Sequence, residues 1–311
     1  MELVMFVGIP ASGKSTMSAA YREQGYLVLS SDEIRDTLLE GTGLGGIPEQ
    51  ERAHIHRQVF EKIRKRTGEA MKQGQSVVVD ATNLGRKRRM SFLKQFRQFD
   101  CTKKCVLFIT SAEICMERNR KRTGNARVPE SDMQRMLCNF ECPNYWEGWD
   151  EIIPVTDAVP YQFPVGEIRG FDQDNPHHSL TLEEHMAAAA RFCAEQGYGE
   201  MLERVAACHD IGKLYTKQFR NSRGEPTEDA HYLGHDNYGA YLYLTEMCCG
   251  KTLAEEDFRK VLYETCLINC HMRPLIHWRW TDNAEEKDRQ LFGEEFLFHL
   301  QALHQADRSA H

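Results

Sequence analysis

The sequence predicts an α/β domain with a parallel sheet flanked by helices, followed by an all-α domain. The first domain is predicted because short apolar runs alternate with polar helical stretches, and a glycine-rich loop follows the first run. The second is predicted because helices rich in alanine and other apolar residues dominate after a proline-rich interval. We find no internal repeat or low-complexity tract.

The chain of 311 residues has a length typical of two domains. Its net charge of −7 is unevenly spread, because residues 1–160 carry +3 and the remainder carries −10. Eleven of the 13 histidines also follow residue 160. Four of the ten prolines fall in one short interval that lacks helical periodicity: Pro154, Pro160, Pro164 and Pro176. We therefore expect domains at residues 1–155 and 176–311, joined by a proline-rich linker at 156–175.

No apolar run approaches the length that crosses a bilayer, and the N-terminus lacks the basic region of a signal peptide. We therefore expect a soluble, cytoplasmic protein that does not bind a membrane. The 11 cysteines then indicate reduced thiols. None forms a C-x-x-C pair, so neither a zinc knuckle nor a thioredoxin-like motif is indicated.

The glycine-rich loop has the spacing G-x-x-x-x-G-K-[ST] of a phosphate-binding loop, with an apolar strand before it and a helix after it. Gly8 and Gly13 allow backbone N–H groups to turn toward phosphate oxygens. Lys14 can reach the β- and γ-phosphates, and the Ser15 hydroxyl can hold Mg²⁺. The positive end of the following helix adds to this attraction. The loop therefore predicts that ATP and Mg²⁺ bind at Gly8, Ala11, Ser12, Gly13, Lys14, Ser15 and Thr16.

A second strand is predicted at residues 26–30, and the sequence SSDEIR follows its end. A carboxylate at the C-terminal end of a strand faces the ligand crevice of an α/β sheet, which is where a general base would lie. Asp32 could instead cap the next helix, but Ser30 or Ser31 could take that position. We therefore favour Asp32 as a functional residue.

Residues 50–72 are predicted to form one long polar helix, whose KIRKR run we interpret as a solvated face rather than a binding patch. The next apolar strand ends in Asp80, whose carboxylate could bind Mg²⁺ directly or through hydrogen bonds to the Mg²⁺ ligands. Thr82 and Asn83 are then expected to lie close to the transferred phosphate. Four basic residues, 86–89, come next. They could bind a phosphate-rich ligand or lie on a helix surface, and the sequence leaves both open.

A further buried strand is predicted at residues 105–110, followed by a segment dense in guanidinium groups. Such a segment can close over ATP and neutralise charge that develops on the phosphoryl group. The spacing of Arg118 and Arg122 predicts that both lie on one helix face. Surface charge is the better interpretation for Arg120 and Lys121.

Over roughly residues 2 to 150, these elements resemble the P-loop kinases related to the phage-type 5′-hydroxyl polynucleotide kinase. The resemblance is carried by GIPASGKST, SSDEIR, VVDATN and the RNRKR…RVPES segment. It implies that Asp32 activates the acceptor hydroxyl and that Arg35 contacts nucleic-acid phosphate. It also implies a lid whose arginines are Arg118 and Arg122, with Arg127 as a further candidate.

The second half carries a different set of polar residues. His185 lies near the start of an alanine-rich helix, and His209-Asp210 is expected within another apolar helix. Burying an unpaired aspartate is costly, whereas imidazoles and carboxylates together can chelate a divalent ion. His235, His271 and Asp307 follow in further helical contexts. Together these residues predict a metal site.

From about residue 176 to the end, the chain resembles the HD-domain metal-dependent phosphohydrolases. The resemblance implies four metal ligands, which are His185, His209, Asp210 and Asp307. It places His235 and His271 at a second metal or facing the phosphate, and Lys213 on a phosphate oxygen. Imidazole ligands favour Mn²⁺, Co²⁺, Ni²⁺ or Fe²⁺ over Mg²⁺. His177 and His178 could start the site instead, but we choose His185 because it lies inside the predicted helix.

A kinase joined to a phosphohydrolase suits the repair of broken RNA, because a ligase needs a 5′-phosphate and a 3′-hydroxyl. We therefore expect 5′-phosphorylation of nucleic-acid ends, RNA rather than DNA, and removal of a 2′,3′-cyclic or 3′-phosphate, with a ligase as the functional partner. One alternative is a nucleoside or nucleotide kinase with an HD nucleotidase, which the acidic net charge favours. Another is a nucleotide-sensing regulatory module, against which Asp32 argues. The oligomeric state, including a homo-oligomer, stays open.

Overall fold

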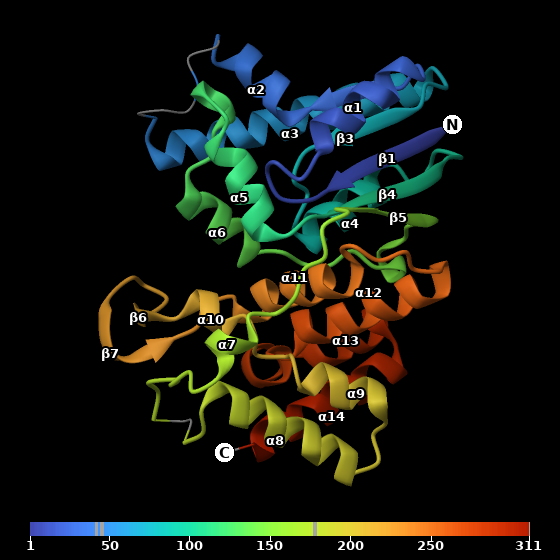
Figure 1. The fold of residues 1–311 in the computed structure, drawn as a ribbon. Coiled ribbons are helices and arrows are strands. Elements are labelled where there is room, and N and C mark those ends of the chain that lie inside the picture. Colours follow the sequence, from blue (N-terminus) through green and yellow to red (C-terminus); the bar gives the residue numbers. More distant parts are fainter. Residues whose placement is uncertain (41–42, 44–46, 177–178, 311) are drawn as a thin grey trace. The chain divides into compact units, whose positions relative to one another are not determined.

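The computed structural model describes residues 1–40, 43, 47–176 and 179–310 (Figure 1). The chain divides into two compact units. The first comprises Met1–Gln134 and Pro143–Asp157, and the second comprises Arg135–Cys142 and Ala158–His311. Among the described residues, no helix is both long and apolar enough to cross a membrane.

The first unit is built on a five-stranded sheet in the order β2-β3-β1-β4-β5, with every pairing parallel. The strands are β1 Glu2–Val7, β2 Leu27–Ser30, β3 Val77–Asp80, β4 Thr102–Ile109 and β5 Glu151–Thr156. The centres of β1, β3 and β4 are buried apolar runs, as expected where helices cover both faces of a parallel sheet, whereas the edge strand β5 is more exposed. The expected parallel α/β fold is confirmed. β4 begins before its apolar run, since the polar residues Lys103 and Lys104 still pair with β1.

Five α-helices among the described residues connect and cover these strands: α1 Lys14–Glu23, α2 Ser31–Leu38, α3 Glu49–Lys72, α4 Arg86–Gln95 and α5 Ala112–Arg120. A further helix, α6 Glu130–Leu137, begins in the first unit and ends in the Arg135–Cys142 segment of the second. Short 3₁₀ helices lie at Gly124–Ala126 and Tyr145–Glu147. The long polar helix expected at residues 50–72 is confirmed as α3. Its buried side chains recur at helical spacing, as at Ile55, Val59 and Ile63, and α3 packs against β2 and β3.

The second unit is mostly helical: α7 Val165–Ile168, α8 Leu182–Glu195, α9 Glu200–Ala206, α10 Lys213–Thr216, α11 His235–Cys248, α12 Glu255–Cys270, α13 Ala284–Phe292 and α14 Glu294–Ser309. A π-helical turn lies at Pro274–Trp278. Thr181 and Glu184 form a capping box that starts α8. Helix α8 packs against α9 and α14, and α11 packs against α12.

The expectation that this region is all-α is wrong in one respect. An antiparallel hairpin, β6 Gln218–Arg220 and β7 Pro226–His231, lies between α10 and α11. Its turn is closed by Asn221, whose side chain bonds to Glu225, and by Gly224 at φ 82°. The strands are mostly exposed and polar, so they lack the apolar alternation that would have revealed them.

Candidate functional site

The phosphate-binding loop joins β1 to α1 at the C-terminal edge of the sheet. Gly8 packs so closely against β4 that an added Cβ would lie 2.8 Å from the Cβ atom of Phe108. Gly13 has φ 102° and is the N-cap of α1, a conformation that L side chains rarely adopt. No side chain caps the N-terminus of α1, so its first N–H groups are available to phosphate oxygens.

Lys14 lies over this loop. Its Nζ atom donates hydrogen bonds to the carbonyl oxygens of Gly8, at 3.0 Å, and Ile9, at 2.6 Å. Burial lowers the pKa of Lys14 to about 8, although the nearby carboxylate of Asp80 acts in the opposite direction. The loop therefore holds a buried ammonium group where the motif predicts contact with phosphate.

Asp80 ends β3, and its Oδ2 atom accepts a hydrogen bond of 2.6 Å from the Ser18 hydroxyl. Burial raises the pKa of Asp80, opposed by the Ser18 hydrogen bond and by Lys14. The structure thus orients Asp80 through Ser18, a residue that sequence reasoning missed. Its position one turn after Ser15 on α1 was the available signal.

Asp32 lies in the first turn of α2, directly after β2. Ser30 caps this helix, since its hydroxyl accepts from the Glu33 N–H at 3.4 Å, so Asp32 is not the cap. The Asp32 side chain is 80% exposed and pairs with Arg35, with Oδ1 and Nη1 2.6 Å apart. The two residues that the kinase resemblance assigns to the acceptor therefore lie next to each other.

Hydrogen bonds fix the segment after β3 to the rest of the sheet. Thr82 accepts a hydrogen bond from the Gly8 N–H through its carbonyl oxygen. The Asn83 amide is buried and donates to the Phe6 carbonyl at 2.8 Å, so it fixes the segment to β1. Arg89 is fully buried and forms a bidentate ion pair with Glu147. Neither interpretation of the basic run 86–89, ligand binding or a helix surface, holds for Arg89.

The arginine-rich segment differs from expectation in one place. Helix α5 ends at Arg120, so Arg122 lies beyond it and does not share a helix face with Arg118. The chain turns away at Gly124, which has φ 56°. Arg118 pairs with Asp157 at 2.7 Å. Arg120 and Lys121 form exposed pairs with Glu130 and Glu117, as surface charges do, and Arg127 is exposed.

In the second unit, the side chains of His185, His209, Asp210 and Asp307 converge, with one ligand atom of each within 4.8 Å of the others. They come from α8, from the turn between α9 and α10, and from α14. Asp210 also lies within this distance of His235, which begins α11, and His271, which follows α12. The structure therefore gathers the six predicted residues at one place. Five of the six are buried, and Asp307 is partly exposed.

Two expectations need qualification. His209-Asp210 lies in the turn after α9 rather than on a helix, because α9 ends at Ala206. His177 and His178, the alternative first ligands, lie outside the described residues.

Each of the four imidazoles donates from Nδ1 to a backbone carbonyl oxygen at 2.7 Å. The pairs are His185 with Ala310, His209 with Ala206, His235 with Tyr232, and His271 with Ile268. A carbonyl oxygen can only accept, so every Nδ1 atom carries the proton and the neutral ring keeps its lone pair on Nε2. Metal-binding histidines are oriented by this kind of hydrogen bond.

Asp210 lies between two pairs of imidazoles. Its Oδ2 atom is 3.2 Å from Nε2 of His185 and 3.5 Å from Nε2 of His209. Its Oδ1 atom is 3.1 Å from Nε2 of His235 and 3.5 Å from that of His271. Each carboxylate oxygen of Asp210 therefore faces two imidazole nitrogens, and Asp210 could contribute a ligand atom to either group of histidines.

The charges and donors fit a divalent cation. Burial would raise the pKa of Asp210, but Lys213 and His209 hold it well below its usual range. Burial lowers the pKa of His185, yet hydrogen bonds to Asp210 and Asp307 raise it to about 10. Within the described part of the chain, the buried Nε2 atom of His209 has no hydrogen-bond partner. Two imidazoles and two carboxylates are ligands that transition metals prefer.

Lys213 reaches this cluster from the first turn of α10. Its buried ammonium lies 2.6 Å from Oδ2 of Asp210 and donates to Oε1 of Gln173 at 2.8 Å. Tyr232 donates through its hydroxyl to the Gln173 carbonyl oxygen, at 2.5 Å. Gln173 and Tyr232 therefore fix the lysine that the HD resemblance assigns to phosphate. Sequence reasoning missed both, because neither lies in a motif.

A glycine-rich loop between the first strand and helix of a parallel sheet, with the buried Lys14 and Asp80 beside it, is the arrangement of P-loop nucleotide-binding folds, and the first unit has it. Folds of this kind bind ATP together with Mg²⁺. Comparison with known protein families agrees, since residues 3–143 match the model of the AAA domain.

Curated relatives include kinases. The chain is 22% identical over 190 residues to the L-seryl-tRNA(Sec) kinase of Methanococcus maripaludis, which covers 58% of this chain and 69% of the relative. It is 24% identical over 165 residues to the bifunctional polynucleotide phosphatase/kinase of Schizosaccharomyces pombe, covering 52% and 34%. It is 27% identical over 165 residues to the human heterogeneous nuclear ribonucleoprotein U-like protein 2, covering 49% and 21%. The matches thus span about two thirds, a third and a fifth of these relatives.

Solved structures that match include a putative kinase from Chloroflexus aurantiacus, at 17% identity and a TM-score of 0.42, covering 50% of this chain and 84% of that one. A gluconokinase from Sinorhizobium meliloti matches at 22% identity and a TM-score of 0.35, covering 51% and 84%.

Proposed function

We propose that the protein heals broken RNA ends with two activities. The first unit transfers the γ-phosphate of ATP to a 5′-hydroxyl group of RNA. The second unit removes a 2′,3′-cyclic phosphate or a 3′-phosphate and depends on a divalent transition metal. Together these activities produce the 5′-phosphate and 3′-hydroxyl that a ligase joins.

Asp32 supports the kinase half of this proposal. Its carboxylate is exposed at the end of β2, on the edge of the sheet where the phosphate-binding loop begins. It accepts the proton of the 5′-hydroxyl while the hydroxyl oxygen bonds to the γ-phosphorus, and the bond to the β-phosphate oxygen breaks to release ADP. Arg35, which pairs with Asp32, would hold the adjacent phosphate of the acceptor. Two of the relatives are named for a tRNA and for a polynucleotide as substrate.

The observation that carries the phosphohydrolase half is the arrangement of imidazoles around Asp210. Four histidines with Nδ1 bonded to backbone carbonyls turn Nε2 toward shared carboxylates, which is the donor set and orientation of metal-binding histidines. His185, His209, Asp210 and Asp307 would hold the ion. A bound divalent ion supplies an acidified water and polarises a phosphoryl oxygen. Lys213, held by Gln173, orients the phosphate.

The test of the kinase activity measures transfer of labelled γ-phosphate from Mg-ATP to a short 5′-hydroxyl RNA, beside equal concentrations of free nucleosides. We expect label on the RNA, and a loss of about a hundredfold or more in Asp32→Asn, which keeps the shape but not the basicity. Label on nucleosides alone would contradict the RNA kinase activity and indicate a nucleoside kinase. Full activity of Asp32→Asn would remove Asp32 as the base.

The test of the second activity uses the same RNA with a 2′,3′-cyclic phosphate end and protein loaded with Mn²⁺. We expect release of phosphate that EDTA abolishes and that excess Mn²⁺ restores. A metal-loaded protein that leaves both cyclic and 3′-phosphate ends intact would contradict this half of the proposal.

A further inference from the structure

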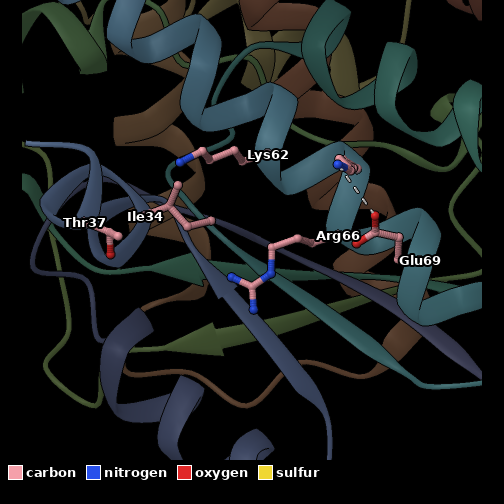
Figure 2. Close-up of a pocket in the computed structure, with 6 residues that line it drawn as sticks. Ile34, Thr37, Lys62, Arg66 and Glu69 are labelled. Carbon is pink, nitrogen blue, oxygen red and sulfur yellow. Dashed lines mark ion pairs between the residues drawn. The ribbon is translucent and has the colours of Figure 1, made fainter.

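A cleft lies between α2 and α3 in the first unit, and its lining residues do not belong to the phosphate-binding loop. It has a volume of about 360 Å³ and is lined by Ile34, Thr37, Lys62, Lys65, Arg66 and Glu69 (Figure 2). Three of these side chains are cations and belong to the KIRKR run that sequence analysis interprets as a solvated face. The structure places them on the wall of a cleft.

The cations of the cleft are not equivalent. Lys65 lies 4.0 Å from Glu69 and forms an ion pair with it. Lys62 and Arg66 make no ion pair or side-chain hydrogen bond with any residue that the structure describes. They stand four residues apart on α3, where like charges repel. Figure 2 shows both side chains extending toward Ile34, while the ion pair of Glu69 lies to one side. The cleft therefore carries two uncompensated positive charges that an anion would neutralise.

The floor of the cleft is apolar. Ile34 is only 8% exposed, and beside it the Thr37 hydroxyl donates to the Glu33 carbonyl and retains its capacity to accept. Two cations over an apolar floor match a ligand that combines an anion with an apolar body. A phosphodiester with its attached nucleoside has this composition, whereas a free inorganic anion uses only the cations.

The position of the cleft sets which phosphate it could bind. Ile34 follows Asp32 by two residues, which places it roughly 200° around α2, on the opposite face of the helix. A helix with its side chains is about 10–12 Å across. A phosphate in the cleft therefore belongs to a part of the acceptor remote from the hydroxyl at Asp32. A free nucleoside has no such phosphate.

We propose that this cleft binds an internal phosphodiester of a single-stranded nucleic-acid acceptor, through Lys62 and Arg66. The inference rests on the proposed kinase function and narrows its substrate class, because the cleft favours oligonucleotides over nucleosides and dinucleotides.

The test uses the full chain with Lys62→Gln and Arg66→Gln combined, and Lys65→Gln as the matched control on the same helix. Kinase kinetics are compared for a 5′-hydroxyl RNA 12-mer and a dinucleotide, whose single phosphate adjoins the reacting end. We expect the double variant to raise KM for the 12-mer about tenfold, with kcat and the dinucleotide KM unchanged. The slope of log affinity for the 12-mer against log salt concentration should become less negative by about 1 to 2. The control Lys65→Gln should change neither the KM for the 12-mer nor this slope.

Three outcomes would overturn the inference. An unchanged 12-mer KM in the double variant would show that the cleft is unused. An equal effect of Lys65→Gln would reduce it to general surface charge. Equal effects on the 12-mer and the dinucleotide would place the cations near the reacting end. Failure of the proposed function is distinguishable, because the wild-type protein would then phosphorylate neither RNA.

Discussion

At the scale of single residues, Lys14 illustrates how the phosphate-binding loop opposes stability. Its ammonium is buried over backbone carbonyls before any phosphate arrives. Its pKa of about 8 lies below the usual 10.5, so the folded protein binds this proton less tightly than the unfolded chain does. The free-energy cost of burying the charged Lys14 side chain is fully present below about pH 8. It decreases as the pH rises and vanishes above the pKa of lysine in the unfolded chain. ATP binding would offset it.

We therefore predict that Lys14→Met stabilises the ligand-free protein at pH 7 by about 1 kcal/mol, less than the full shift implies, because lost hydrogen bonds offset part of the gain. The advantage should shrink toward pH 10. Thermal unfolding at both pH values measures this, and millimolar Mg-ATP should reverse the order by stabilising the wild type alone. A variant less stable than the wild type at pH 7 without ATP would contradict the prediction.

Residue roles were predictable where a local motif carries them. Gly8, Gly13 and Lys14 follow from spacing, and the structure gives each a geometric reason. Ser18 and Gln173 were missed because their roles depend on partners far away in sequence, Asp80 and Lys213. Patterns within one window cannot reveal contacts across 62 or 40 positions.

At the scale of elements, Arg89 joins α4 to the 3₁₀ helix at Tyr145–Glu147. It forms two hydrogen bonds with Glu147 and two with the carbonyls of Asn83 and Leu84, at full burial. Trp149 also donates to Glu147. Removing one partner of a buried ion pair leaves an uncompensated charge, which costs more than the pair itself contributes.

We predict that Arg89→Met lowers the free energy of unfolding by about 3–5 kcal/mol. The combined variant Arg89→Met/Glu147→Gln should recover at least part of this loss, since its interior holds no unpaired carboxylate. Urea unfolding of the two variants measures both values. At urea concentrations below the midpoint of its unfolding, Arg89→Met should keep the wild-type KM for RNA. A raised KM would indicate that Arg89 binds the substrate.

The elements themselves differ in how far the sequence determines them. Strands buried on both faces show as apolar runs, and α3 shows its helical period, so these were predicted. The end of α5 before Arg122 depends on the turn at Gly124, and the hairpin β6–β7 depends on hydrogen bonds between polar strands. Hydrophobic periodicity carries no information about either.

At the scale of the whole molecule, each unit has its own buried core and its own cluster of chemical groups. In the first unit these are the loop, Asp32 and Asp80; in the second they are the imidazoles and Asp210. The clustered residues His185, His209, Asp210 and Asp307 were singled out together from the sequence, but the Nδ1 partners of the histidines could not be predicted, because a hydrogen bond to a backbone carbonyl has no sequence signature.

We predict that His209→Ala or Asp210→Ala abolishes metal-dependent phosphohydrolysis and leaves 5′-kinase activity within about twofold of the wild type. Mn²⁺ should raise the unfolding temperature of the wild type but not of these variants. Kinase and phosphatase assays on the same preparations, with circular dichroism to confirm folding, measure this. Loss of both activities in a folded variant would contradict independent units.

The hydrogen bond between His185 and Ala310 joins residues 125 positions apart. During synthesis, α8 leaves the ribosome well before α14, which carries Asp307. The cluster of His185, His209, Asp210 and Asp307 therefore cannot be completed until α14 has emerged, whereas the strands and helices around the phosphate-binding loop have emerged long before. A chain stalled before α14 would hold the complete first unit, whereas His185 would lack the Asp307 carboxylate and the Ala310 carbonyl oxygen.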